Sequence, residues 1–227
     1  MGIDFVAVLT FTPKLAATNA RDFVLGLREH LRMRAMVIGP GFALGREREG
    51  DELTLRSLGE EFDFTVEVVS PMTIDGEVVS STSIRNALSI GDMARVRRFL
   101  GRPFTLDGQV VPGREGGKGL GFPTANLAVD EERAIPADGV YITRAYLDGR
   151  PYNSVTNIGT RPTFGEGERV VETYILDFDG DIYAHWLSIE LLERMRGEMR
   201  FASGKELGEQ IARDVQRARE WLEHHGD

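Results

Sequence analysis

The stretch Tyr141-Ile-Thr-Arg-Ala-Tyr-Leu-Asp-Gly-Arg150 decides the fold of the second half of the sequence. Its side chains alternate with a period of two residues, Tyr141, Thr143 and Ala145 falling on one face, which predicts a half-buried strand. Asp148-Gly149 is the dipeptide typical of two-residue hairpin turns. The stretch therefore predicts two antiparallel strands joined by a tight turn.

Further strands follow. The run Trp186 to Leu191 alternates in the same way, and Phe178-Asp-Gly-Asp181 offers a second Asp-Gly turn. A last helix is predicted from Ser203, which can cap it together with Glu206, to Leu222. After Pro103 we expect an antiparallel sheet that closes into a small β-barrel, followed by a C-terminal helix.

The first half of the sequence shows a different pattern of apolar residues. Short apolar runs at 5–9, 36–38 and 64–69 are separated by helical patterns, including an apolar stripe from Ala20 to Leu31. Strands that alternate with helices favour an open parallel sheet covered by helices. Ser80 to Thr82 offer N-caps for another helix, and residues 90–101 read as a helical connector. The chain is thus predicted to hold two domains.

Composition narrows the function classes. The 227 residues carry a net charge of −9 with a pI near 5.1, which argues against nucleic-acid or anionic-membrane partners. There is no cysteine, so thiolate catalysis and sulfur metal sites are excluded. No apolar run approaches the ~20 residues that span a bilayer. These features predict a cytoplasmic protein, and they leave its oligomeric state open.

A glycine-rich segment, Gly113-Arg-Glu-Gly-Gly-Lys-Gly-Leu-Gly121, carries the clearest chemical signal. Backbone N–H groups of such a loop can surround phosphates, and Lys118 adds positive charge. Thr124 and Asn126 follow in fixed register and offer oxygens to a metal-bound phosphate. The order of residues does not match the P-loop of nucleoside triphosphatases. By composition alone, a flexible surface loop is the alternative.

Several motifs in order extend this signal. They are Leu100-Gly-Arg-Pro-Phe104, Gly121-Phe-Pro-Thr-Ala-Asn-Leu127, Pro136-Ala-Asp-Gly-Val-Tyr141, Asn157-Ile-Gly-Thr-Arg-Pro-Thr-Phe164, Val171-Glu-Thr-Tyr-Ile-Leu-Asp-Phe178 and Gln210-Ile-Ala-Arg-Asp214. Together they resemble the riboflavin kinase module of the bacterial bifunctional riboflavin kinase and FAD synthetase. Val37 to Phe42, Arg46 to Asp51 and Ser80 to Arg85 are similar to the later part of that family's adenylyltransferase domain.

The resemblance implies three regions: a partial FMN adenylyltransferase domain (1–89), the helical connector (90–101) and a riboflavin kinase domain (102–227). It assigns the catalytic base to Glu172 and a Mg²⁺ site to Thr124 and Asn126. It implies ATP and phosphate contacts from Gly113, Gly117, Lys118, Gly119, Gly121, Thr124 and Asn126. It implies flavin contacts from Asn157, Arg161, Arg200 and Phe201. Taken alone, Glu172 in an apolar strand would read as a solvent-facing residue.

The first half departs from the family pattern. The 227 residues contain no His-x-Gly-His phosphate signature, although Ser81, Thr82 and Arg85 match the family's second nucleotide loop. Because positioning of phosphates dominates nucleotidyl transfer, we expect FMN adenylylation to be absent or crippled.

The sequence therefore predicts an enzyme that transfers the γ-phosphate of ATP to the 5′-hydroxyl of riboflavin, giving FMN and ADP. Two alternatives stay open. One is a fragment of a bifunctional enzyme that also makes FAD, and the other is a non-catalytic flavin-binding barrel.

Overall fold

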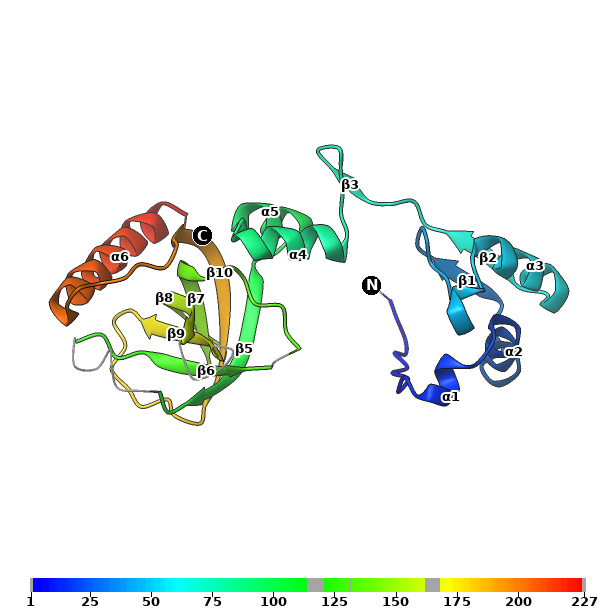
Figure 1. Cartoon of the computed structure of the whole chain (residues 1–227), viewed down its shortest axis with the longest axis horizontal. Coiled ribbons are helices and arrows are strands. Elements are labelled where there is room, and N and C mark those ends of the chain that lie inside the picture. Colours follow the sequence, from blue (N-terminus) through cyan, green and yellow to red (C-terminus); the bar gives the residue numbers. More distant parts are fainter. Residues whose placement is uncertain (1, 114–120, 131, 162–167, 226–227) are drawn as a thin grey trace. The chain divides into compact units, whose positions relative to one another are not determined.

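A computed structural model describes residues 2–113, 121–130, 132–161 and 168–225, with only the backbone of Arg161 and Glu168. The chain divides into two compact units, Met1–Thr73 and Ile74–Asp227. Figure 1 labels their elements. Within the described residues, no helix has the length and apolar character needed to cross a bilayer.

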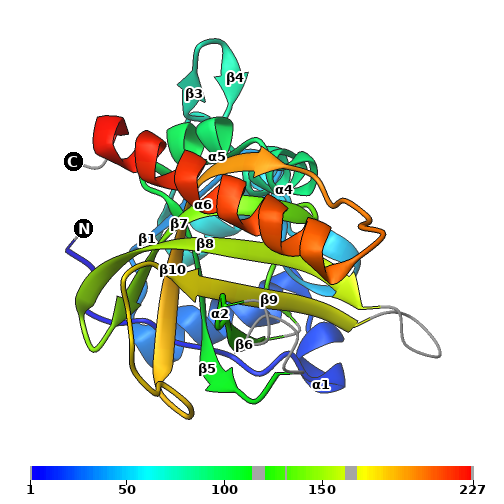
Figure 2. The same cartoon turned by 90° about the vertical axis from the view of Figure 1, so that its left-hand side faces the viewer.

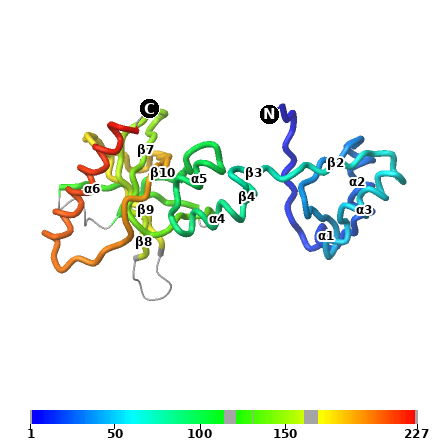
Figure 3. The backbone as a smooth tube through the Cα atoms, turned by 90° about the horizontal axis from the view of Figure 1, so that it is seen from above, coloured from blue at the N-terminus to red at the C-terminus, as the bar shows by residue number. Residues whose placement is uncertain are grey.

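The first unit is a two-stranded parallel sheet with helices. Its elements are α1 (Pro13–Ala16), α2 (Ala20–Leu31), β1 (Ala35–Ile38), the 3-10 helix η1 (Arg46–Arg48), α3 (Glu52–Phe62) and β2 (Thr65–Val68). β1 and β2 pair in parallel from Ala35 opposite Thr65 to Ile38 opposite Val68. α2 and α3 lie beside this sheet (Figure 3). A small core packs these two helices on the sheet and consists of Ala20, Val24, Ile38, Leu55, Leu58 and Phe64.

Side-chain caps start the helices of this unit. Asn19 accepts a hydrogen bond from the Asp22 N–H at the start of α2, and Asp51 accepts one from the Thr54 N–H at 2.9 Å at the start of α3. These caps satisfy N–H groups that have no partner inside the helix. The bond from Thr54 also lowers the pKa of the Asp51 carboxyl below its ordinary value.

The strand expected at residues 5–9 is wrong. Residues 2–12 form no strand, and the side chains of Phe5 and Val8 are 93% and 91% exposed. Among the described residues, β1 and β2 pair only with each other. A strand without a neighbour leaves its backbone groups unpaired, so apolar composition alone does not make one.

The second unit is a closed β-barrel with three helices. The strands are β5 (Phe104–Val111), β6 (Ala125–Val129), β7 (Gly139–Leu147), β8 (Arg150–Arg161), β9 (Glu168–Ile175) and β10 (Trp186–Arg196). They close in the order β10-β5-β6-β9-β8-β7, and each strand is antiparallel to both of its neighbours. The predicted barrel is confirmed, and so is the hairpin at Asp148-Gly149, which joins β7 to β8.

The second predicted hairpin is wrong. Asp179 and Gly180 lie in a connection that runs from the end of β9 at Ile175 to the start of β10 at Trp186. β9 pairs with β6 and β8, whereas β10 pairs with β5 and β7. Because the chain must pass from one side of the barrel to the other, a two-residue turn cannot make this connection.

Helices cover the barrel in two places. α4 (Ser81–Ile90) and α5 (Met93–Leu100) place Ala87, Leu88, Met93 and Val96 in the same buried cluster as the barrel interior. α6 (Gly204–His225) lies across the outside of the strands (Figure 2), where Ala218 and Leu222 pack on Val140, Ile142 and Val155. A hairpin of β3 (Thr73–Ile74) and β4 (Glu77–Val78) precedes α4.

The predicted domain boundaries stay predictions. The contacts divide the chain after Thr73, so α4 and the predicted connector fall in the unit that holds the barrel.

Candidate active site

Three predicted site residues form one row across neighbouring strands. Asn126 of β6 lies directly opposite Glu172 of β9, and Glu172 lies directly opposite Asn157 of β8. Residues directly opposite each other in antiparallel strands share a face, with Cβ atoms about 4.5–5.5 Å apart. The barrel register therefore brings a carboxylate between two amides that are far apart in the sequence. We call these three residues the polar row.

The polar row faces outward from the barrel. Val171 and Thr173, on either side of Glu172, are 2% and 0% exposed, and Ile158 beside Asn157 is fully buried. Since side chains alternate along a strand, Glu172 and Asn157 lie on the outer surface, where both are half-buried. A carboxylate in this position is held by rigid strands and is still within reach of a ligand.

The glycine-rich segment meets the polar row at both of its ends. The backbone of Gly113 lies against the side-chain amide of Asn126 so closely that a Cβ atom would collide with it. Phe122 packs edge-on against Tyr174, two residues from Glu172, with ring centroids 5.4 Å apart. Thr124 is half-buried directly before β6. The ends of the loop are thus fixed beside the carboxylate.

Part of the predicted phosphate cradle lies outside the described residues, namely Gly117, Lys118 and Gly119. Gly121 is described and has φ of +82°, a left-handed conformation that favours glycine. The role of these residues in phosphate binding stays a prediction.

A second carboxylate, from Glu198, lies near the row. Gly159 is two residues from Asn157 on β8, and a Cβ atom there would collide with Glu198 Oε1. The end of the Glu198 side chain thus occupies the space over Gly159 that a Cβ atom would fill. We did not predict Glu198 from the sequence, although it lies in the segment that supplied two expected flavin contacts; its position depends on a meeting of distant strands.

The expected flavin contacts are placed unevenly. Arg200 is exposed and Phe201 is half-buried, both just before α6. Arg161 is the last residue of β8 and lies opposite Glu168. The structure describes only the backbone of Arg161. Of these four expected contacts, the register brings Asn157 next to Glu172.

A polar cluster braces the barrel end at which β8 ends and β9 begins. The Thr160 hydroxyl donates to Asp138 Oδ2 at 3.1 Å, and Arg169 forms an ion pair with the same carboxylate. Nearby, the Tyr141 hydroxyl donates to the Ala137 carbonyl. Burial raises the pKa of Tyr141, and the positive charges of Arg194 and Arg169 partly oppose this shift.

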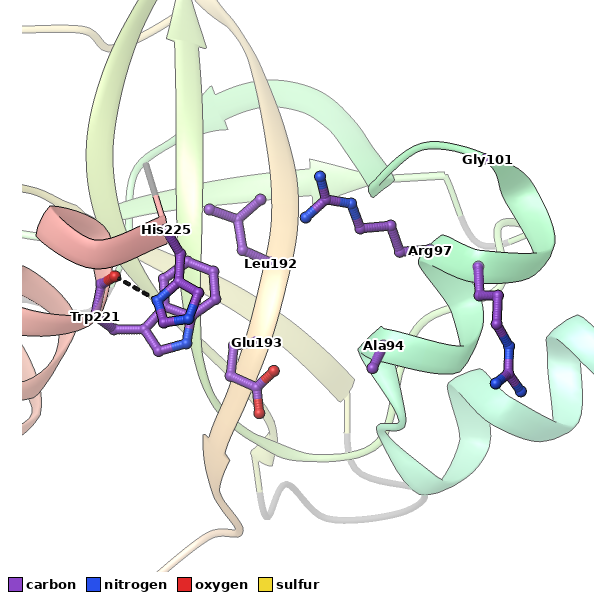
Figure 4. A pocket seen from close by; sticks show the side chains of 8 residues that line it. Ala94, Arg97, Gly101, Leu192, Glu193, Trp221 and His225 are labelled. Carbon is purple, nitrogen blue, oxygen red and sulfur yellow. Dashed lines mark hydrogen bonds between the residues drawn. The ribbon is translucent and has the colours of Figure 1, made fainter. Parts of the chain in front are cut away.

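Two open pockets lie away from the polar row. One of about 560 Å³ lies between α5, β10 and α6 (Figure 4), where the rings of Trp221 and His225 stack with centroids 4.5 Å apart. The other, of about 400 Å³, belongs to the first unit and includes Gly41 and Phe42. Neither contains a residue predicted for the kinase site.

The expected remnant nucleotide loop lies at the start of α4. Ser81, Thr82 and Arg85 are exposed there. The turn is closed by a capping box in which the Ser83 N–H donates to Ser80 Oγ at 3.1 Å and the Ser80 N–H donates to Ser83 Oγ at 2.9 Å. This geometry explains why the serines stand where they do without requiring a nucleotide.

The donor set around the row suits a hard cation. Within the described part of the chain, no group of three or more His, Cys, Asp or Glu residues is arranged to hold a metal. Mg²⁺, however, is commonly held by one or two protein oxygens together with phosphate oxygens and water. The Thr124 hydroxyl and the Asn126 carbonyl are donors of that kind. The residues present therefore fit a magnesium ion that arrives with a nucleotide.

Comparison with known proteins identifies the family. The riboflavin kinase family matches residues 100–222, and the FAD synthetase family matches residues 1–83. A bifunctional riboflavin kinase/FMN adenylyltransferase from Escherichia coli K12 is 38% identical over 223 residues, which cover 97% of this chain and 71% of that protein. The protein of the same description from Pseudomonas fluorescens is 39% identical over 220 residues, 96% of this chain and 70% of that protein.

A solved structure also resembles the chain. A protein from Streptococcus pneumoniae, described as a macrolide-efflux protein, gives a TM-score of 0.82 at 29% identity and covers 93% of this chain and 68% of that one. Matches at both levels extend over nearly the whole sequence. The chain therefore belongs to the bifunctional riboflavin kinase/FMN adenylyltransferase family, and its barrel is the riboflavin kinase domain.

Proposed function

We propose that this riboflavin kinase transfers the γ-phosphate of Mg-ATP to the 5′-hydroxyl of riboflavin. The observation that carries the proposal is the polar row, because it sets one carboxylate between two amides beside the ends of a glycine-rich loop. Phosphoryl transfer needs these parts: a phosphate cradle, oxygens for a cation, and a group that orients the attacking hydroxyl.

Glu172 is the proposed base. Its carboxylate accepts the proton of the riboflavin hydroxyl while the hydroxyl oxygen forms a bond to the γ-phosphorus and the bond to the β-phosphate oxygen breaks. The products are FMN and ADP. The flanking amides can orient Glu172 and the hydroxyl, since an amide offers both a donor and an acceptor.

We place the phosphates of ATP at the Asn126 end of the polar row, away from Asn157. Gly113 and Gly121 start and end the proposed cradle, with Gly117, Lys118 and Gly119 between them. Thr124 and Asn126 would hold Mg²⁺, which when bound neutralises charge on the phosphates. At the opposite end, Asn157, Arg161, Arg200 and Phe201 are the proposed flavin contacts.

We further propose that the chain makes little FAD by itself and works in the cytoplasm, where ATP is supplied. The match to the FAD synthetase family over residues 1–83 favours adenylylation as a second candidate function. Against it, the 227 residues contain no His-x-Gly-His segment to position the phosphates.

One assay separates these functions. The purified chain is incubated with ATP, riboflavin and Mg²⁺, and the nucleotides and flavins are separated by ion-pair chromatography. We expect equal amounts of FMN and ADP, both abolished by a chelator of Mg²⁺. FAD with pyrophosphate would support adenylylation instead, and riboflavin that is bound but unchanged would overturn the kinase proposal in favour of a binding barrel.

A further inference from the structure

A buried ion pair joins the end of the last barrel strand to the C-terminal helix. Arg196, the final residue of β10, donates from Nε and from a terminal nitrogen to Asp214 Oδ2 of α6, at 3.0 and 2.7 Å. Gln210 donates to the other carboxylate oxygen at 2.9 Å. The Arg196 and Asp214 side chains are only 18% and 8% exposed. Such a two-pronged pair fixes direction as well as distance.

The pair closes the base of the segment 197–203, which connects β10 to α6. A terminal nitrogen of Arg196 also donates to the Gly197 carbonyl at 3.0 Å, so the guanidinium holds the first peptide of this segment. At the far end, Ser203 caps α6 by accepting from the Glu206 N–H at 3.2 Å. Glu206 in turn accepts from the Ala202 N–H at 3.1 Å. Both ends of the segment are thus held.

The held segment lies against β8, the strand that carries Asn157 of the polar row. The carboxylate of Glu198 contacts β8 at Gly159, two residues from Asn157. The carbonyl of Arg196 approaches Gly139 at the start of β7 so closely that a Cβ atom there would collide with it. Between these contacts and α6, Met199 and Arg200 are exposed. The segment therefore forms one wall next to Asn157.

We propose that Asp214, acting through Arg196, is a positioning residue for the flavin side of the kinase site. The proposal rests on the kinase function proposed above. Loss of the Asp214 charge releases the guanidinium, and residues 197–203 then occupy several positions. Riboflavin must select the one that fits, so its apparent affinity falls by the fraction of molecules in that position. The phosphate cradle borders Asn126 instead, so ATP binding is spared.

The test compares variants of two ion pairs that each involve α6, one with its acid on the helix (Asp214) and one with its acid after β9 (Asp177). Asp214→Asn keeps the shape of the side chain and removes its charge. Asp177→Asn is the matched control, because Asp177 also makes a two-pronged ion pair with α6, through Arg219 at 2.7 and 2.7 Å, but does not adjoin segment 197–203. In Asp214→Asn, we expect the KM for riboflavin to rise by about tenfold if about a tenth of molecules stay competent, with the KM for ATP within about twofold. The control keeps both constants.

Limited trypsin digestion tests the anchoring without any assay of activity. Cleavage after Arg200, identified by mass spectrometry, should be faster in Asp214→Asn than in the wild type and in Asp177→Asn, at a temperature where all three are folded. Unchanged cleavage after Arg200 and an unchanged KM for riboflavin would overturn the proposal. If the wild-type chain phosphorylates nothing, the kinase function fails, while the cleavage result still decides whether Asp214 anchors the segment.

A second variant covers the case in which Asp214→Asn does not fold. The double substitution Arg196→Met with Asp214→Leu removes both charges and fills their space with apolar atoms, an exchange that folded proteins often accept. We expect this variant to fold and to show the same rise in the KM for riboflavin. A folded double variant with wild-type kinetics and wild-type cleavage would show that the pair serves stability alone.

Discussion

Glu172 is the residue on which the proposed chemistry depends. If its carboxylate accepts the proton of the riboflavin hydroxyl, Glu172→Gln should lower kcat by on the order of 10²–10⁴ and leave riboflavin binding within a few-fold. Steady-state kinetics and a riboflavin titration measure the two effects. Glu193→Gln is a suitable control, because Glu193 lies on β10 and lines the pocket of Figure 4. A Glu172→Gln enzyme with nearly unchanged kcat would rule out the base.

A substitution of Thr124 tests the proposed magnesium site. Replacement of its hydroxyl by a methyl group in Thr124→Val removes an oxygen donor at nearly constant volume, so Mg-ATP should bind more weakly while the fold persists. Calorimetric titration with Mg-ATP and thermal unfolding check both expectations. Wild-type affinity in a folded variant would show that Thr124 takes no part in the cation site.

Because of Tyr141, we expect the free energy of unfolding to fall at alkaline pH. Burial raises its pKa in the folded protein. Its contribution to stability is therefore complete below the unfolded pKa of about 10 and declines as the pH rises through the higher folded value. Tyr141→Phe removes this decline, although it also loses the hydrogen bond to Ala137. Urea unfolding between pH 8 and 11 should show a flatter profile for the variant; parallel profiles would contradict the assignment.

The candidate site was partly readable from residue types. Asn126, Glu172 and Asn157 were chosen from their motifs, but only the register of β6, β9 and β8 shows that they are neighbours. The sequence does not reveal Glu198, because its carboxylate lies over Gly159 of β8, which is 39 positions earlier in the chain. A contact of that kind has no local signature in the sequence.

At the scale of elements, four buried hydroxyls link β7, β8 and β9 inside the barrel. Thr143 bonds to Ser154 and to Thr156 at 2.8 Å each, and Thr156 bonds to Thr173 at 2.9 Å. All four side chains are fully buried. Thr156 and Thr173 stand directly behind Asn157 and Glu172, so these bonds tie the strands together beneath the polar row.

The central member of this group gives a stability prediction. Thr156→Val removes the bonds to Thr143 and Thr173; Thr143 keeps its bond to Ser154, whereas the Thr173 hydroxyl loses the partner described above. An unpaired buried polar group costs about 1–3 kcal/mol. Urea unfolding should show a loss of that order. Ser89→Ala, on the exposed face of α4, serves as the control. Val155→Thr is unsuitable, because Val155 packs under α6. A stable Thr156→Val protein would mean that the other hydroxyls re-pair.

The elements show which sequence patterns are reliable. Alternation with an Asp-Gly turn correctly located β7 and β8, because a two-residue hairpin is a local structure. The same dipeptide at Asp179-Gly180 misled, since the partners of β9 and β10 are set by closure of the barrel. Residues 5–9 misled because a strand requires a neighbour that local composition does not reveal.

At the scale of the whole molecule, the boundary between the units is testable. The buried cluster of the barrel includes Ala87, Leu88, Met93 and Val96 from α4 and α5. A fragment of residues 74–227 should therefore fold and keep kinase activity, whereas one of residues 98–227 loses these side chains. Each large one contributes about 1.5–3 kcal/mol of burial. Thermal unfolding and the riboflavin assay compare the fragments; equal stability would favour a boundary near residue 101.

Closure of the barrel by β10 sets an order of events during synthesis. β5 is the first barrel strand to leave the ribosome, yet one of its two neighbours is β10, which begins only at Trp186. At a rate of synthesis of about 5–20 residues per second, one edge of β5 stays unpaired for several seconds. The first unit, whose parallel pair lies within residues 35–68, has no such delay. Nascent chains that stall between these strands therefore expose an unpaired strand edge, which favours aggregation.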